Sequence, residues 1–158
     1  MDQRRFEYRL SRFKLEIPGL VAAGFIDLDS GDWIALESTG PHPKEFLSYL
    51  AATTQAYFEG DAVRTIKTVL DEATDSPHPP REIEEIIIRS SGHFHFLQRL
   101  EDEPRVALGI VTTREPKLGL VRAAVKQVLE EPIDEADALS SARKRRDFGT
   151  MSLEPTED

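Results

Sequence analysis

Apolar residues recur at spacings of three and four near the start of the chain, and this pattern predicts an amphipathic helix over residues 2–16. The members of the apolar stripe are Phe6, Leu10, Phe13 and Ile17. The arginines expected to lie away from the stripe are Arg4, Arg5, Arg9 and Arg12. Pro18 and Gly19 should end the helix, because proline cannot continue it and glycine permits a turn.

A hairpin and a long helix are predicted next. Residues 20–29 (LVAAGFIDLD) have the pattern of a buried strand, residues 29–32 that of a turn, and residues 33–38 (WIALES) that of a second strand. After the breaker at 41–43, apolar residues keep the helical period from Lys44 to about Ala73, on the order of 40 Å at 1.5 Å per residue. Gly60 is a weak point at which this helix can kink. The apolar members are Phe46, Leu47, Leu50, Tyr57, Phe58, Val63, Ile66, Val69 and Leu70.

Three more strand candidates and a final helix follow a proline-rich loop. The strand candidates are EIIIRS (85–90), HFHFLQRL (93–100) and RVALGIVT (105–112), of which the last has the apolar character of a central strand. The final helix should cover 118–130. The residues expected on its inner side are Leu120, Val121, Ala124, Val125 and Val128.

The predicted order is α-β-β-α-β-β-β-α, which is an α+β fold of the α/β sandwich type. Because the strands come mostly in hairpins, the five-stranded sheet should be mainly antiparallel. Residues 1–131 would form the folded domain. Beyond Pro132 the chain is charged and poor in large apolar groups, so 132–158 is predicted to be a mobile charged tail.

Composition narrows the classes of partner. The net charge of −9 disfavours nucleic acid and anionic membrane as partners. The sequence contains no cysteine, which suits a reducing compartment, and we expect a cytoplasmic protein. We expect neither a signal peptide nor a membrane-spanning segment, because the first residues lack an apolar stretch and no apolar run approaches about 20 residues.

Two clusters contain residue types that can bind metals. His93 and His95 alternate on a predicted strand and share a face, but a zinc site needs at least a third protein ligand, and the alternative is two half-exposed strand residues. Asp27, Asp29 and Asp32 crowd the first hairpin. They lack the ligand order of an EF-hand, and local hydrogen bonding in a solvated turn explains them better.

Catalytic motifs are not found in the sequence. It has neither a Walker phosphate loop nor a GxGxxG spacing, and its serines form no nucleophile elbow. Glu82, Glu84 and Glu85 are best explained as a solvated stretch before a strand. We therefore predict a protein-interaction domain that is not an enzyme, with no catalytic residue, cofactor or metal.

Three segments, taken in order, resemble the roadblock/dynein light chain family and, more narrowly, its bacterial MglB-type members. They are residues 17–38 (IPGLVAAGFIDLDSGDWIALES), 50–60 (LAATTQAYFEG) and 117–129 (KLGLVRAAVKQVL). The resemblance spans about residues 6–130. It implies a roadblock fold, dimers, and a role as regulator or scaffold for small Ras-like GTPases or motor complexes.

Under this resemblance we expect a homodimeric regulator that binds a small Ras-like GTPase and orders its catalytic loops, without an arginine finger. The alternative is an adaptor subunit of a signalling, polarity or motor complex that leaves nucleotide hydrolysis unchanged. The resembled fold puts the isoleucines of the third strand at a sheet edge, where two copies could pair. These predicted dimer-interface residues are Ile86, Ile87 and Ile88.

The exposed side of the long helix and the basic cluster near the C-terminus are the predicted partner-binding surface. Tyr57 and Phe58 are adjacent, so they point about 100° apart and cannot both face one core. Whichever is exposed is a candidate interface residue. The full predicted set is Gln55, Tyr57, Phe58, Glu59, Arg64, Lys67, Arg143, Lys144, Arg145 and Arg146.

Overall fold

The structure, a computed structural model, describes residues 2–40, 44–73 and 82–133. These residues form two compact units, one made of the segments up to Pro18 and from Pro116 onward, the other of Gly19–Glu115. The elements of the first unit are α1 (Gln3–Glu16) and α4 (Leu118–Glu130). Those of the second are β1 (Leu20–Asp27), β2 (Trp33–Ser38), α2 (Lys44–Glu59), α3 (Asp61–Ala73), β3 (Glu85–Arg89), β4 (His93–Arg99) and β5 (Val106–Thr113).

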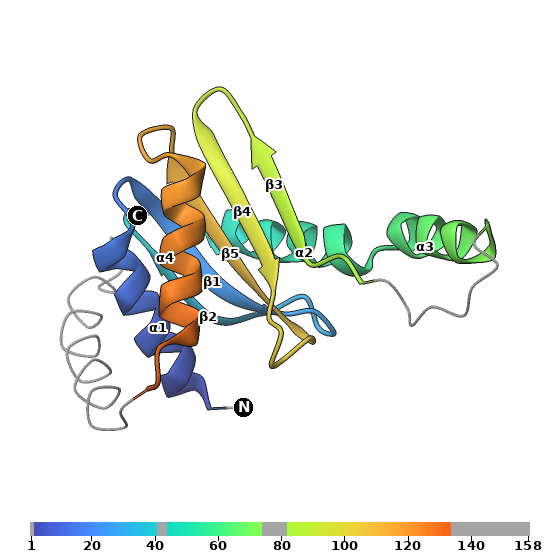
Figure 1. Cartoon of the computed structure of the whole chain (residues 1–158), viewed down its shortest axis with the longest axis horizontal. Helices are drawn as coiled ribbons and strands as arrows, with labels where there is room; N and C mark the ends of the chain where they lie inside the picture. The colour runs from blue at the N-terminus through green and yellow to red at the C-terminus, as the bar shows by residue number, and fades with distance from the viewer. Residues whose placement is uncertain (1, 41–43, 74–81, 134–158) are drawn as a thin grey trace. The chain divides into compact units, whose positions relative to one another are not determined.

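The five strands form one antiparallel sheet in the order β2-β1-β5-β4-β3 (Figure 1). The largely apolar strand β5 is central, and β3 is an edge strand with a single neighbour in the described part of the chain. The α+β fold, the antiparallel sheet, the central position of β5 and the edge position of β3 are thus confirmed.

Helix α2 packs on one face of this sheet, and a glycine makes the fit possible. The Trp33 indole lies over Gly24, where an added Cβ would come within 2.3 Å of the ring. The indole Nε1 donates a hydrogen bond to the Leu47 carbonyl of α2 at 2.8 Å. A larger residue at position 24 would therefore displace the tryptophan that fastens the beginning of α2 to the sheet.

The predicted long helix is wrong in one respect, because it is broken into α2 and α3 at Gly60. Gly60 still donates its N–H to the Ala56 carbonyl at 2.9 Å, and its own carbonyl accepts from Arg64 at 3.0 Å. A Cβ at this position would lie 2.5 Å from the Ala56 carbonyl oxygen, so the local backbone admits glycine but no side chain. The order of elements becomes α-β-β-α-α-β-β-β-α.

The unit of α1 and α4 confirms the predicted helix bounds and corrects two side chains. The stripe of Phe6, Leu10, Phe13 and Ile17 is buried, and Asp2 caps α1 by accepting the Arg4 N–H. Two residues of this unit differ from the prediction in their exposure, Arg9 and Leu120. Arg9 is buried because its guanidinium reaches the Leu129 carbonyl at 3.2 Å. Leu120 is 46% exposed, one helical position away from the buried Val121, so it does not belong to the inner side.

Candidate interaction surfaces

Helix α2 separates its two adjacent aromatic residues. Phe58 is fully buried and packs in a cluster with Leu28, Leu97 and Ala107, whereas Tyr57 is 41% exposed. The predicted division of the pair is confirmed, and Tyr57 is the member available to a partner. Phe58 must be withdrawn from the predicted partner-binding set, because it belongs to the core.

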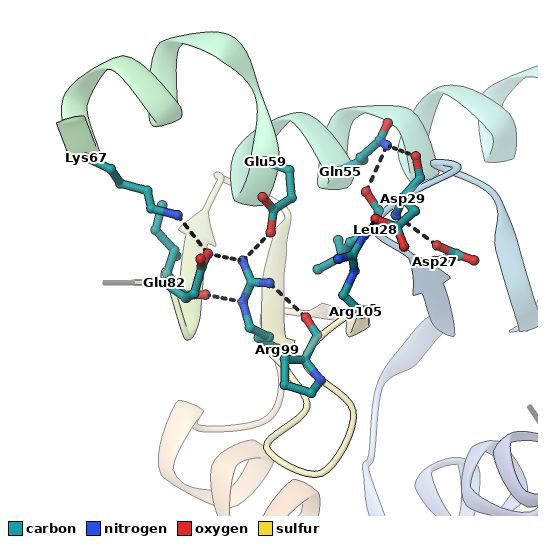
Figure 2. A network of polar contacts seen from close by, with 11 residues as sticks. Asp27, Leu28, Asp29, Gln55, Glu59, Lys67, Glu82, Arg99 and Arg105 are labelled. Carbon is teal, nitrogen blue, oxygen red and sulfur yellow. Dashed lines mark hydrogen bonds and ion pairs between the residues drawn. The ribbon is translucent and has the colours of Figure 1, made fainter. Parts of the chain in front are cut away.

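Three of the predicted partner-binding residues are instead held by contacts within the chain, in the network drawn in Figure 2. Arg99, with a side chain only 8% exposed, lies at its centre. Its Nη2 lies 2.7 Å from a carboxylate oxygen of Glu59 and 3.2 Å from one of Glu82. Lys67 reaches the same Glu82 oxygen at 2.7 Å. The network thus joins the end of α2, helix α3 and the segment that enters β3.

The same arginine also bonds the backbone on both sides of β4. Its Nε donates to the Ile83 carbonyl at 2.9 Å and its Nη1 to the Pro104 carbonyl at 2.8 Å. The guanidinium lies over the Phe58 ring, 5.4 Å from its centroid, which is within cation–π range. A buried cation with this many partners fixes the junction of α2 and α3 against the sheet.

Gln55 fastens the other side of α2 to the first hairpin. Its amide donates to the carbonyls of Leu28 at 2.9 Å and Asp29 at 3.0 Å. Asp29 also forms an ion pair with Arg105, and both side chains are mostly exposed. Gln55, Arg99, Arg105 and the exposed Arg64 line a polar cleft of about 520 Å³. Arg99 and Arg105 of this lining pair with carboxylates of the same chain, so the polar character of the cleft is explained by contacts that stabilise the fold.

The turn of the first hairpin is likewise explained by local bonds. One oxygen of the Asp27 carboxylate accepts the N–H groups of Asp29 at 2.8 Å and Ser30 at 3.3 Å. Gly31 has φ of +75°, a conformation that glycine adopts without cost. Asp27 therefore stabilises the turn through local hydrogen bonds, which is the explanation that the sequence favours for this cluster.

A predominantly apolar groove of about 150 Å³ lies between α2 and the sheet. Its α2 wall comes from Leu50, Thr53 and Tyr57, and its floor includes Val111 of β5. On its far side it is bounded by Ile88 of β3 and His95 of β4, which are register partners. The groove therefore extends from α2 toward the edge of the sheet.

The edge strand β3 presents isoleucines on both faces of the sheet. Ile88 pairs with His95 on the α2 side and Ile87 with Phe96 on the other side, while Ile86 packs against the Phe58 cluster. All three isoleucines are half-buried. Among the described residues no second strand pairs with β3, and an edge strand with apolar side chains favours pairing with another strand.

Similarity to solved structures identifies the fold. Myxococcus xanthus MglB superposes with a TM-score of 0.61 at 13% identity, covering 99% of this chain and 96% of that one. A Roadblock/LC7 domain from Streptomyces avermitilis gives 0.57 at 10% identity, covering 91% and 97%. An MglB described as having a tetrameric arrangement gives 0.58 at 18% identity, covering 80% and 85%. The chain has the roadblock fold. No family model and no curated protein sequence matches it.

The histidine pair lies on strand β4 of the roadblock sheet. His93 is exposed, and His95 is half-buried in the apolar groove. Burial, and to a smaller degree the charge of His93, lower the pKa of His95 below its ordinary value of 6.5. No group of three potential metal ligands occurs among residues 2–40, 44–73 and 82–133.

Two further predictions fall partly outside the structure. The tail from residue 134 onward, with the basic cluster Arg143, Lys144, Arg145 and Arg146, lies outside the described residues. Among the described helices, none is long and apolar enough to cross a membrane.

Sequence reasoning missed the two residues that organise the α2 side of the roadblock sheet. Arg99 lies at the end of an alternating strand and its sequence context does not indicate burial, although the acidic segment at 82–85 could have suggested a cationic partner. Trp33 begins a strand of ordinary composition. That its indole packs over Gly24 of the neighbouring strand is evident only once the strand register is known.

Proposed function

We propose that this chain is a dimeric, cytoplasmic, non-enzymatic regulator that binds a small Ras-like GTPase and modulates its hydrolysis cycle. The observation that carries the proposal is the fold likeness to MglB over nearly the whole chain. It is supported by the half-buried isoleucines of the edge strand β3, which offer a surface for self-association. The tetrameric arrangement of one similar MglB is further support for assembly.

Dimerisation would proceed by antiparallel pairing of two β3 edges around a twofold axis. Such pairing gives each β3 strand a second neighbouring strand and joins two five-stranded sheets into one. The side chains at this junction would be Ile86, Ile87 and Ile88.

The GTPase would bind the exposed side of α2. Tyr57 is an exposed aromatic residue of α2, as is Tyr49, and Arg64 at the start of α3 adds an exposed cation near Tyr57. The basic cluster at 143–146 has the opposite charge to the protein as a whole, so it would attract an acidic partner face and raise the association rate at low salt.

The test is a pull-down from the source cell, followed by purification of the recovered protein and measurement of nucleotide hydrolysis with and without this chain. A recovered GTPase whose hydrolysis rate changes supports the regulator. A GTPase that binds with an unchanged hydrolysis rate, or a partner of another class, overturns the regulator and leaves the adaptor, the second candidate.

Charge reversal of the cluster 143–146 should slow association with the recovered GTPase, with an effect that fades as salt rises. Tyr57→Ala should instead speed dissociation, because buried aromatic contacts are formed after encounter. Binding kinetics that match wild type in both variants would contradict the assignment of this surface.

A further inference from the structure

Two arginines lie close to one phenylalanine ring at the end of the sheet where β3 turns into β4. The guanidinium carbon of Arg89 lies 5.9 Å from the centroid of the Phe94 ring, and that of Arg114 lies 4.9 Å from it. Both distances are within cation–π range. Arg89 is the register partner of Phe94, and Arg114 follows directly after β5. Three neighbouring strands therefore bring together Arg89, Phe94 and Arg114, which we call the arginine–phenylalanine cluster.

Neither cation of this cluster is neutralised within the part of the chain that the structure describes. No described carboxylate forms an ion pair with Arg89 or Arg114, although Glu115 adjoins the second of them in sequence. Both arginines are exposed. By contrast, Arg105 at the other end of β5 pairs with a carboxylate. Two like charges beside one ring repel each other, and an anion placed between or beside them relieves this repulsion.

The geometry of the cluster leaves hydrogen-bond donors available to such an anion. A guanidinium carries five N–H donors in a planar fork. Arg114 uses one of them, because its Nη1 donates to the Ser90 carbonyl at 2.9 Å, and this bond fixes the side chain beside the hairpin. The side chain of Arg89 donates to no other described residue. Contact with the ring restricts both side chains before binding, so less conformational entropy is lost when an anion is bound.

The cluster lies on the face of the sheet opposite to α2. Ile88 and His95 line the groove between α2 and the sheet. Successive residues of a strand point to opposite faces, so their immediate neighbours Arg89 and Phe94 point to the other face. The surface proposed for the GTPase is on α2. A ligand of the cluster and the GTPase would therefore occupy different faces of the sheet.

The charge of the chain favours a short acidic segment over an extended anionic surface. Membrane-binding segments gather about four to eight basic residues, each worth about 1 kcal/mol, and nucleic acid likewise requires several phosphate contacts. Such surfaces face many charges of the protein at once, so the net charge of −9 opposes them. A short segment meets only the residues that it touches, because charges are screened beyond about 8 Å at physiological salt.

We propose that the arginine–phenylalanine cluster binds the carboxylates of an acidic segment of a second protein partner. Arg89 and Arg114 each take one carboxylate through the bidentate fork that guanidinium and carboxylate share. The half-buried Phe94 ring contacts the aliphatic part of the segment, and arginine with an aromatic residue is the composition of protein interfaces. The inference is independent of the proposed function, since no residue of the cluster is assigned to the GTPase or the dimer surface.

The first experiment titrates the isotope-labelled full chain with a synthetic hexaglutamate peptide and follows its backbone and arginine Nε–H signals by nuclear magnetic resonance. At low salt, the signals of Arg89, Phe94 and Arg114 should shift with a dissociation constant on the order of 1 mM, which is the affinity of a few charge-assisted hydrogen bonds. Raising the salt should weaken the binding. Shifts centred on Arg64 or Arg105 overturn the proposal, and so does an unshifted cluster at about 10 mM peptide.

Matched variants separate the cluster from general attraction between charges. Arg114→Gln should weaken the binding of hexaglutamate at least about fivefold. Arg105→Gln removes the same charge from an exposed position at the other end of β5 and should change the dissociation constant by less than about twofold. Equal weakening by the two variants overturns the proposal. Phe94→Leu should weaken binding by about two- to fivefold, because it keeps an apolar side chain and removes the ring. Wild-type affinity in Phe94→Leu overturns the role given to the ring.

Control probes decide the class of ligand. Hexalysine should leave the signals of the cluster in place, because it has the charge of the cluster itself. Vesicles of phosphatidylcholine with a minor share of phosphatidylserine should not carry the chain down on sedimentation. If the vesicles bind the chain, lose it in Arg114→Gln, and hexaglutamate shifts nothing, the cluster belongs to a lipid surface and the proposal is overturned. Circular dichroism of each variant checks that the fold is kept.

Discussion

Helices α2 and α3 are consecutive, similar in length and both amphipathic, yet they relate to the sheet in opposite ways. In α2, Ala51, Thr54 and Phe58 are buried against the core, whereas α3 has no buried residue along its fully described length. The contrast teaches that an apolar stripe predicts a covered face without saying which chain covers it. For α2 the cover is the sheet of the same chain, and for α3 no described residue of the chain buries the stripe.

The junction between the two helices follows the same division. Gly60 ends the part of the helical stretch that rests on the sheet, and immediately beside it Glu59 is tied to Arg99. Beyond the junction, the ion pair of Lys67 with Glu82 connects α3 to the segment that enters β3. The buried charge of Arg99 therefore lies at the junction where the helical stretch stops packing on the sheet.

The largest effect is expected from removing an apolar side chain on α2 and the corresponding one on α3. Phe58→Ala should lower the free energy of unfolding by about 3–5 kcal/mol, because it opens a cavity in a fully buried cluster. Ile66→Ala should change it by less than about 0.5 kcal/mol at concentrations too dilute for association. Denaturant unfolding of both variants measures the difference. A comparable loss in Ile66→Ala would show that α3 is packed within one copy.

A smaller effect is expected from the buried charge at the helix junction. Arg99→Met keeps an unbranched side chain with an apolar stem but leaves Glu59 and Glu82 without their cation, and should cost about 3 kcal/mol of unfolding free energy. Arg105→Met is the matched control. Its ion pair with Asp29 is largely exposed and should contribute less than about 1 kcal/mol. Equal losses of unfolding free energy in the two variants would show that the buried ion pairs of Arg99 contribute no more than the exposed pair of Arg105.

Most of the fold could be predicted from hydrophobic period and turn chemistry, because those patterns are local. The strands at 85–90 and 93–100 and the final helix at 118–130 are found within one residue of their predicted bounds. The sequence indicates Gly60 as the place where the helix can break, but it does not show whether the helix breaks there, since glycine is tolerated inside helices. Only the nearby backbone shows that a side chain would not fit at this position.

The candidate surface was predicted less well, because exposure depends on partners distant in sequence. Gln55, Glu59 and Lys67 look like ordinary surface residues of a helix, but each meets a group from another element. Arg9 was expected in solvent and is buried because a carbonyl 120 residues away accepts its hydrogen bond. Periodicity assigns a residue to a side of a helix, and tertiary contacts decide whether that side is open.

The junction itself can be tested by adding one carbon atom. Gly60→Ala should cost about 1–3 kcal/mol, because its Cβ would collide with the Ala56 carbonyl oxygen and force the backbone to move. The same change at Gly119 in α4 meets no atom within 4 Å and should stabilise by up to about 1 kcal/mol through helix propensity. Thermal unfolding of the two variants should therefore shift in opposite directions. A stabilised Gly60→Ala would mean that α2 and α3 join into one helix at little cost.

The smallest effect concerns the apolar groove between α2 and the sheet, and it is a dependence of stability on pH. His95 lines this groove between Ile88 and Val111, with Tyr57 and Thr53 of α2 on the opposite wall and His93 two residues away. Because burial lowers the pKa of His95 below 6.5, the folded chain favours the neutral imidazole. The unfolded chain binds the proton first as pH falls, so this contribution to stability is full above about pH 6.5 and is lost on acidification below it.

His95→Gln should therefore flatten the fall in unfolding free energy between about pH 7.5 and pH 5.5, relative to wild type. His93→Gln removes only the smaller cause of the lowered pKa and should flatten it less. Denaturant unfolding curves recorded over this pH range measure the effect. A pH profile of stability identical in wild type and His95→Gln would contradict the burial of this histidine and leave the groove open to solvent.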